Sequence, residues 1–144
     1  HSYSKSPFWD KYKDDIQEIF KKEFFLLNEI NIEFINYFLK VLDIRTEIKL
    51  SSSLKTKGEK SDLILSICNE LNATKYISGL GSKNYLDIEK LNSEKIEVIF
   101  LESQNPVYNQ FHGDFIPNLS LMDMIMNVDK SEIRDYLIGD LPLE

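Results

Sequence analysis

Hydrophobic residues recur at helical spacing in two segments near the start of the chain. Residues 10–24 place isoleucine and phenylalanine side chains on one face, and Asp10 precedes them as a candidate helix cap. Residues 28–44 carry a wider apolar stripe, which is typical of a helix that is buried over much of its surface. The pattern therefore predicts two packed helices at the start of the chain.

The pattern then changes to short apolar runs separated by polar segments. It predicts strands at 46–50, 74–78 and 96–103, and helices at 61–73 and 87–95. Strands that alternate with helices at this spacing are typical of a parallel sheet with crossover helices. The predicted fold class is therefore α/β, with a small parallel sheet preceded by the two packed helices.

Single residues mark where several of these helices should begin or end. Ser61 and Asp87 are candidate caps of the two crossover helices. Further along the chain, Ser120 and Asp123 fit a capping box at the start of another helix. Gly139 is expected to end a last short helix. The capping box is a sufficient structural explanation for Ser120 and Asp123.

The length of 144 residues predicts a single domain. It would consist of a helical lead-in at 1–45, a β-α-β-α-β core at 46–103, and a motif loop with C-terminal helices at 104–144. In open α/β sheets, ligands bind outside the carboxyl ends of the strands. We therefore expect the binding site in the loops that follow the three strands.

Composition and charge exclude several classes of protein. The net charge is −7 and the basic residues are scattered, which excludes a generic nucleic-acid-binding surface. The single cysteine, Cys68, excludes an internal disulfide and a multi-thiolate zinc site, and its apolar neighbours predict core packing. Two histidines are too few for a histidine-rich metal site, and no metal ligands are predicted, although a carboxylate site for magnesium without a sequence pattern stays open. The apolar runs are far shorter than the ~20 residues that span a bilayer, and no signal-peptide pattern is present, so we expect a cytoplasmic protein without membrane insertion.

The segment GLGSKN, residues 79–84, follows a predicted strand and precedes a helix. Gly79 and Gly81 can bring backbone amides close to a phosphate, and Lys83 can add positive charge. A dinucleotide-binding fingerprint would have a third glycine where Asn84 stands. The same residues also fit a strand-to-helix turn in which glycine supplies a positive φ. Both alternatives stay open.

The stretch NPVYNQFHGDFIPNLSLMD, residues 105–123, mixes aromatic, polar and turn residues, as the wall of a pocket does. His112 and Asp114 are the candidate catalytic residues, because a histidine beside an acid can transfer protons near neutral pH. A structural or substrate-positioning role is the alternative for His112. Tyrosine can stack and hydrogen-bond at once, and glutamine can recognise a polar edge. The candidate substrate-binding residues are Ser78, Gly79, Gly81, Lys83, Tyr85, Tyr108 and Gln110.

Two blocks of the chain, YISGLGSKNYLD (76–87) and IEVIFLESQNPVYNQFHGDFIPNLSLMDMIMN (96–127), resemble the WbqC-like family. The earlier YSKSPFWDKY is similar in the same order, so the resemblance runs from Tyr3 to Asn127. The family occurs in bacteria, often encoded among genes for O-antigen or other surface-polysaccharide synthesis. The resemblance therefore implies an enzyme of that pathway, a transferase that acts on a nucleotide-linked sugar by group transfer or modification. It implies no particular cofactor. The family's motif positions here are Tyr76, Ser78, Gly79, Gly81, Tyr85, Tyr108, Gln110, Gly113, Phe115, Pro117, Ser120 and Asp123.

The resemblance also has a departure. Family members begin with a strand and a segment like HQPNYLPW, which this sequence does not contain, so the chain resembles the C-terminal two-thirds of the family. The rival interpretation is a non-catalytic binding or assembly module, completed by a missing N-terminal segment or by a partner chain. An unpaired sheet edge could then pair with a second copy, as a homodimer, or with another polypeptide.

Overall fold

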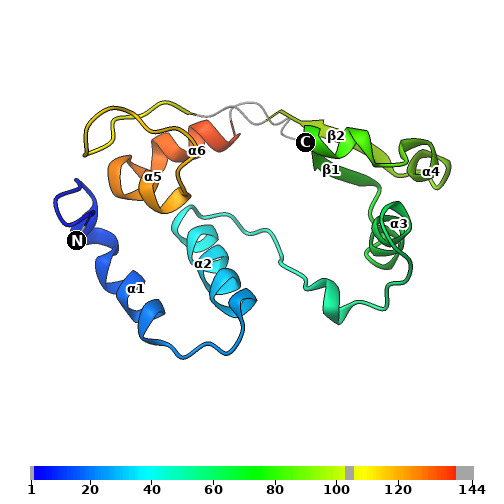
Figure 1. Cartoon of the computed structure of the whole chain (residues 1–144), viewed down its shortest axis with the longest axis horizontal. Coiled ribbons are helices and arrows are strands. Elements are labelled where there is room, and N and C mark those ends of the chain that lie inside the picture. The colour runs from blue at the N-terminus through cyan, green and yellow to red at the C-terminus, as the bar shows by residue number, and fades with distance from the viewer. Residues whose placement is uncertain (1, 103–105, 139–144) are drawn as a thin grey trace. The chain divides into compact units, whose positions relative to one another are not determined.

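The computed structural model describes residues 2–102 and 106–138 of the chain (Figure 1). The chain divides into two compact units. Unit 1 comprises residues 1–46 and 105–144, and unit 2 comprises residues 47–104. Each unit is described by itself, and a single domain formed by both stays a prediction.

The described residues of unit 1 form four helices. They are α1 (Trp9–Lys21), α2 (Leu27–Val41), α5 (Leu121–Asn127) and α6 (Lys130–Ile138). In α1, Ile16 and Ile19 of the predicted apolar face are buried, whereas Phe20 remains 63% exposed. Helices α1 and α2 contact one another, which confirms the predicted pair of packed helices. The expected burial of α2 over much of its surface is wrong, because Tyr37 is its one buried residue.

The core of unit 1 joins both ends of the chain. All four helices contribute side chains to it. The short helix α5 is buried at four consecutive positions, from Asp123 to Met126. Such all-round burial is typical of a helix enclosed by its neighbours rather than lying on a surface. The buried hydrophobic residues are Tyr12, Ile16, Ile19, Tyr37, Leu42, Met124, Ile125, Met126, Val128 and Ile133.

Unit 2 is a small α/β unit. Strands β1 (Lys75–Gly79) and β2 (Glu97–Leu101) pair in parallel and lie side by side (Figure 1). Helix α3 (Ser61–Glu70) precedes β1, and helix α4 (Ile88–Ser93) forms the crossover between the strands. One face of the sheet packs on a core of Cys68, Leu86, Leu91 and Ile96. The predicted fold class, α/β with a small parallel sheet, is confirmed.

The strand predicted at 46–50 is wrong. Residues 44–50 have no regular secondary structure, and the sheet has two strands. Alternation of apolar and polar residues specifies a strand only where one face is buried. Here Ile48 and Leu50 remain 37% and 42% exposed, so their alternation has no core to face.

The predicted helix caps are partly confirmed. Asp87 caps α4, since its Oδ1 accepts a hydrogen bond from the Lys90 amide at 3.0 Å. Helix α1 begins one residue before Asp10, which lies in its first turn and does not cap it. Ser61 is inside α3, and its hydroxyl accepts a hydrogen bond from the Asp87 amide at 2.9 Å, so it joins two helices instead of capping one. The stop predicted at Gly139 lies outside the described residues.

The buried cysteine behaves as predicted. Cys68 lies on α3 and is 4% exposed in the core of unit 2. Burial raises the pKa of its thiol. A thiol with a raised pKa is a poor nucleophile, so Cys68 packs the core and is not a reaction centre.

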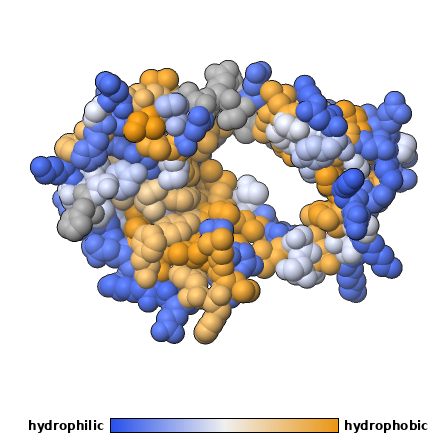
Figure 2. All heavy atoms as spheres, in the orientation of Figure 1, coloured by the Kyte–Doolittle hydropathy of each residue, from blue (hydrophilic) through white to orange (hydrophobic). Residues whose placement is uncertain are grey.

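Some hydrophobic side chains of unit 1 remain uncovered. Phe25 is 90% exposed and Leu27 is 76% exposed, both near the connection between α1 and α2. Figure 2 shows hydrophobic spheres on the surface where these two helices are joined.

Among the described residues, no helix has the length and apolar character required to cross a membrane.

Candidate functional site

A buried carboxylate lies at the centre of the most organised polar cluster in unit 1. Asp123, on α5, is 5% exposed. Its Oδ2 accepts hydrogen bonds from the Tyr108 hydroxyl at 2.8 Å and from the Gln110 side-chain amide at 3.1 Å. Its Oδ1 has the side-chain amide of Asn127 at the long distance of 3.4 Å. The Tyr3 hydroxyl is a further hydrogen-bond donor to the carboxylate. The described donors to Asp123 are therefore all uncharged: two phenols and two amides.

The loop before α5 is held in place by the Gln110 side chain. The Gln110 Oε1 accepts a hydrogen bond from the Ile116 amide at 2.8 Å, and its Nε2 donates to the Ile116 carbonyl at 2.9 Å. Gly113, in the turn between them, has φ +63, a conformation that favours glycine. The Phe111 amide donates to the Asn127 side chain at 3.1 Å, which ties the loop to α5. One glutamine therefore closes the loop and also contacts the buried carboxylate.

A pocket of about 180 Å³ lies beside this cluster. Its walls come from the N-terminal segment, the loop and α5. Most of the lining side chains are apolar or uncharged, so the pocket favours a small group with one polar edge. The residues that line it are Ser2, Tyr3, Gln110, Phe111, His112, Ile116, Leu119, Asp123 and Asn127.

His112 contacts the N-terminal segment and not the neighbouring acid. Its Nε2 lies 2.6 Å from the Ser2 carbonyl oxygen, which can only accept a hydrogen bond. Nε2 must therefore carry the proton, which leaves Nδ1 as the acceptor in the neutral ring. His112 also packs edge-on against Phe111, with ring centroids 4.8 Å apart. Its ring is thus oriented by two contacts.

Two phenols near the carboxylate are kept protonated. Burial and the hydrogen bond to Asp123 raise the pKa of Tyr108 to about 12. Burial, the nearby Asp123 charge and a hydrogen bond to Asp123 also raise the pKa of Tyr3. Both hydroxyls are therefore neutral donors at pH 7. The site consists of one carboxylate, neutral donors around it and a small apolar pocket; within the described residues no group of three potential metal ligands occurs.

The structure brings three of the predicted residues of the 105–123 stretch together. Tyr108, Gln110 and His112 all lie at or next to the Asp123 pocket. Asp114 is exposed and does not line the pocket. His112 takes its hydrogen bond from the Ser2 carbonyl instead of from Asp114.

The remaining predicted residues belong to unit 2 and form a separate group. After β1, the Ser82 hydroxyl donates to the Gly79 carbonyl at 2.9 Å and lies 2.7 Å from the Ser78 hydroxyl. Lys83 lies over the Phe100 ring, 5.0 Å from its centroid. Tyr85 is 67% exposed. These contacts fix the conformation of the turn after β1, whereas the Tyr85 side chain faces solvent.

The explanation of the two glycines by positive φ is wrong. Gly79 has φ −73, and Gly81 is not among the described glycines with positive φ. A Cβ atom added at either position would meet no atom within 4 Å. Neither backbone conformation nor internal packing of unit 2 therefore requires glycine at these positions.

Replacing Gly81 with alanine is expected to raise the free energy of unfolding by about 0.4–1 kcal/mol. Alanine can adopt the backbone conformation that residue 81 has in the folded chain, and it reduces the conformational entropy of the unfolded chain. Gly113→Ala is the matched control, since its φ of +63 disfavours a side chain and stability should fall by about 1 kcal/mol or more. Urea denaturation measures both variants. A loss of stability with Gly81→Ala would contradict the open space seen around this residue.

Sequence reasoning missed the central residue of the site. Asp123 is the N-terminal-turn acid of α5, but Ser120 makes no side-chain capping bond, and the Asp123 carboxylate turns to Tyr108 and Gln110 instead. Tyr3 and Asn127 were not singled out either. A signal was present, because Asp123 interrupts the apolar run LMDMIM, where a charged side chain is expected to be buried and partnered.

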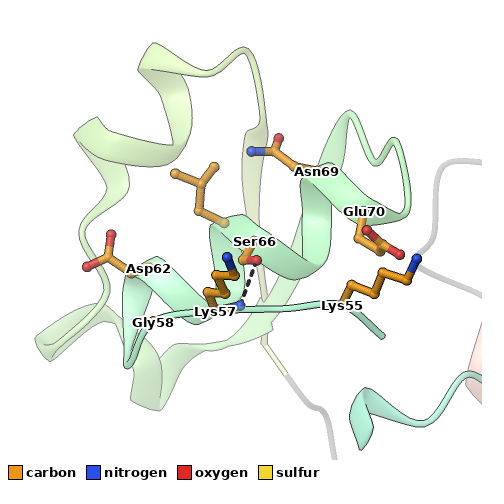
Figure 3. A pocket seen from close by; sticks show the side chains of 8 residues that line it. Lys55, Lys57, Gly58, Asp62, Ser66, Asn69 and Glu70 are labelled. Carbon is orange, nitrogen blue, oxygen red and sulfur yellow. Dashed lines mark hydrogen bonds between the residues drawn. The ribbon is translucent and has the colours of Figure 1, made fainter. Parts of the chain in front are cut away.

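A second, more open hollow lies in unit 2. Figure 3 shows the extended segment with Lys55 and Lys57 running alongside α3. The Lys57 amide donates to the Ser66 hydroxyl at 3.0 Å, drawn as a dashed line. The rim of this hollow carries both acidic residues, Asp62 and Glu70, and the two lysines, so its charge is mixed. None of the predicted site residues lines it, and we do not assign it a function.

Comparison with known proteins places these residues in a family. The model of the WbqC-like protein family matches residues 1–135, which include both groups of predicted site residues. A protein of Mycobacterium tuberculosis strain H37Rv, named uncharacterized protein Rv1507c, is 28% identical over 112 residues. The match covers 77% of this chain and 48% of the relative, so the chain spans about half the relative's length. No solved structure matches significantly. The chain belongs to the WbqC-like protein family.

Proposed function

We propose that this chain is an enzyme, or part of one, of bacterial surface-polysaccharide synthesis, and that it acts on a nucleotide-linked sugar by group transfer or modification. Family membership supports the proposal, since the resemblance implies that pathway. The observation that carries it is the buried Asp123 carboxylate, held by Tyr108 and Gln110 beside a small pocket. Buried ionisable groups next to a pocket are characteristic of functional sites.

The volume of the pocket limits what it can hold. At about 180 Å³ it is smaller than the ~300–1,000 Å³ typical of sites for drug-sized ligands. It would take one sugar ring or a substituent of that ring, and the nucleotide would lie outside. In unit 2, considered by itself, a phosphate would contact Gly79, Gly81 and Lys83 with help from Ser78, and Tyr85 would stack on a base.

The residues of unit 1 would act on the sugar. Gln110 and Asp123 would fix a polar edge of the ring, and Tyr108 would keep the carboxylate in position. His112 would accept a proton at Nδ1 from a hydroxyl group of the substrate, because its Nε2 already donates to the Ser2 carbonyl.

A thermal-shift screen of the 144-residue chain with nucleotides and nucleotide-sugars, with and without magnesium, tests the proposal. A ligand that binds only the folded chain stabilises it by ~2.7 kcal/mol at a hundredfold excess over its Kd. We expect a rise in Tm with at least one nucleotide-sugar, and Gln110→Ala should weaken that binding by about tenfold or more. Gln17→Ala, at an exposed position of α1, should leave the binding unchanged. A folded sample without a shift for any member of the panel would overturn the proposal.

A second candidate function is a binding or assembly module. The observation that favours it is the open face of the β1–β2 sheet, where Ile77 is 53% exposed and Leu101 is 41% exposed. Parallel sheets are usually covered on both faces, so this face suits a partner polypeptide or a second copy of the chain. Turnover of a nucleotide-sugar by the chain alone would exclude this candidate.

A further inference from the structure

The two oxygens of the Asp123 carboxylate are used unequally. Oδ2 accepts from the Tyr108 hydroxyl and from the Gln110 amide, at 2.8 and 3.1 Å. Oδ1 has the Asn127 amide at 3.4 Å, beyond the usual range of 2.7–3.2 Å for such a bond. The Tyr3 hydroxyl is a further donor to the carboxylate. Asp123 also lines the pocket. A buried carboxylate held by neutral donors thus lies next to a space that a ligand can fill.

The surroundings of this carboxylate lack a fixed positive charge. None of the residues lining the pocket is lysine or arginine, and all of them are described. His112 is the one basic side chain of the lining, and its Nε2 is occupied by the Ser2 carbonyl. The hydrogen-bond partners of Oδ2 are neutral: a phenol and an amide. A buried charge without a counter-charge is unfavourable, so a cation entering the pocket would be strongly favoured.

The pocket walls suit the same kind of ligand. Tyr3 and Phe111 contribute aromatic rings, and Ile116 and Leu119 contribute apolar side chains. Aromatic faces attract cations, and Phe111, which is 44% exposed, can present its ring to a ligand that enters from solvent. A phosphate or carboxylate would instead be repelled by Asp123.

We propose that the pocket beside Asp123 binds a protonated primary amine, which donates to Asp123 Oδ1 and lies between the rings of Tyr3 and Phe111. If the proposed function holds, an amine site in this pocket implies that the substrate is an amino sugar, with its ammonium group in the pocket. The preference is for the charged amine over a hydroxyl at the same ring position.

Two methyl glycosides that differ in one group test the proposal on the full chain. Methyl glucosaminide carries an ammonium group where methyl glucoside carries a hydroxyl. Binding is followed by titration of the amide resonances in ¹⁵N-labelled protein. We expect the amine to bind at least tenfold more tightly and to shift the amides of Gln110, Phe111 and Asn127. Equal binding of the two probes, or shifts confined to unit 2, would overturn the proposal.

The charge of Asp123 is tested with an isosteric variant. Asp123→Asn keeps the shape and removes the charge, so the tenfold preference for the amine should disappear. Asp14→Asn, on the exposed face of α1, is the matched control and should retain it. If Asp123→Asn does not fold, the wild-type comparison of the two probes still decides, because it requires no substitution.

The two proposals can fail separately. If a nucleotide-sugar binds but amine and hydroxyl probes bind equally, the amine site is wrong and the proposed function stands. If the amine binds in an Asp123-dependent way while no nucleotide-sugar shifts the Tm, the amine site stands and the proposed function is wrong.

Discussion

Replacing Ile125 with alanine is expected to lower the free energy of unfolding by about 2–5 kcal/mol. Ile125 lies on α5 and is 0% exposed in the core of unit 1, so the lost side-chain atoms leave a cavity that the surrounding core residues cannot easily fill. A loss of this size is a large fraction of the ~5–15 kcal/mol that holds a typical domain folded. Urea denaturation followed by circular dichroism measures it.

The effect should extend to the candidate site. Asp123 lies two residues before Ile125 on the same short helix, so a helix that loses its packing also loses the position of the carboxylate. Leu27→Ala is the control, because Leu27 is 76% exposed and its truncation should change stability by no more than about 0.5 kcal/mol. A loss below about 1 kcal/mol for Ile125→Ala would show that α5 is not the central helix of unit 1.

Replacing Gln110 with glutamate is expected to destabilise the chain at pH 7 by about 1–3 kcal/mol, because it places a half-buried carboxylate against Asp123 and removes a donor that Asp123 uses. The two side chains have the same shape. In the native site, however, the Gln110 Nε2 donates to Asp123 Oδ2 at 3.1 Å and to the Ile116 carbonyl at 2.9 Å. A carboxylate there would face two acceptors, one of them charged.

The loss in Gln110→Glu should depend on pH in one direction. Repulsion by Asp123 raises the pKa of the introduced carboxyl in the folded chain above its unfolded value of ~4.3. The folded chain then holds more protons than the unfolded chain above that pH, so stability falls as pH rises through the folded pKa. The difference from wild type should therefore be small near pH 4 and complete by about pH 7.

Urea denaturation between pH 4 and 7 measures this dependence. Gln17→Glu, exposed on α1, should differ from wild type by no more than about 0.5 kcal/mol at every pH. If Gln110→Glu matches Gln17→Glu at pH 7, Gln110 does not face the Asp123 carboxylate.

Hydrophobic spacing predicted most of the secondary structure. The apolar stripes of α1 and α2, the cap at Asp87 and the crossover between β1 and β2 all follow from local pattern, and each is present. The strand at 46–50 failed for a tertiary reason. Alternation in Ile48 and Leu50 satisfies the local rule, but a strand also needs a sheet edge and a core, and local sequence carries neither.

Part of the candidate site could likewise be predicted from local sequence, and part could not. Residue type and loop position pointed to Tyr108, Gln110 and His112, because such side chains are suited to pocket walls. Asp123 was assigned to a capping box because its spacing from Ser120 fits one. Its actual partners, Tyr108 and Gln110, lie 15 and 13 residues away along the chain, beyond the reach of any helix-start motif. Tyr3 is more distant still, and only the folded chain brings it to α5.

The discontinuous make-up of unit 1 has a consequence for biosynthesis. Unit 2 is one uninterrupted segment between the two parts of unit 1, so all of its residues leave the ribosome before the first residue of α5. Proteins are synthesised from the N-terminus, and contiguous units fold as soon as they emerge. Helices α1 and α2, by contrast, must wait for a segment more distant in sequence, and closing that long loop costs entropy. Their exposed apolar faces are therefore a target for chaperones during translation, and a nascent chain halted before α5 carries a strand pair but no Asp123 site.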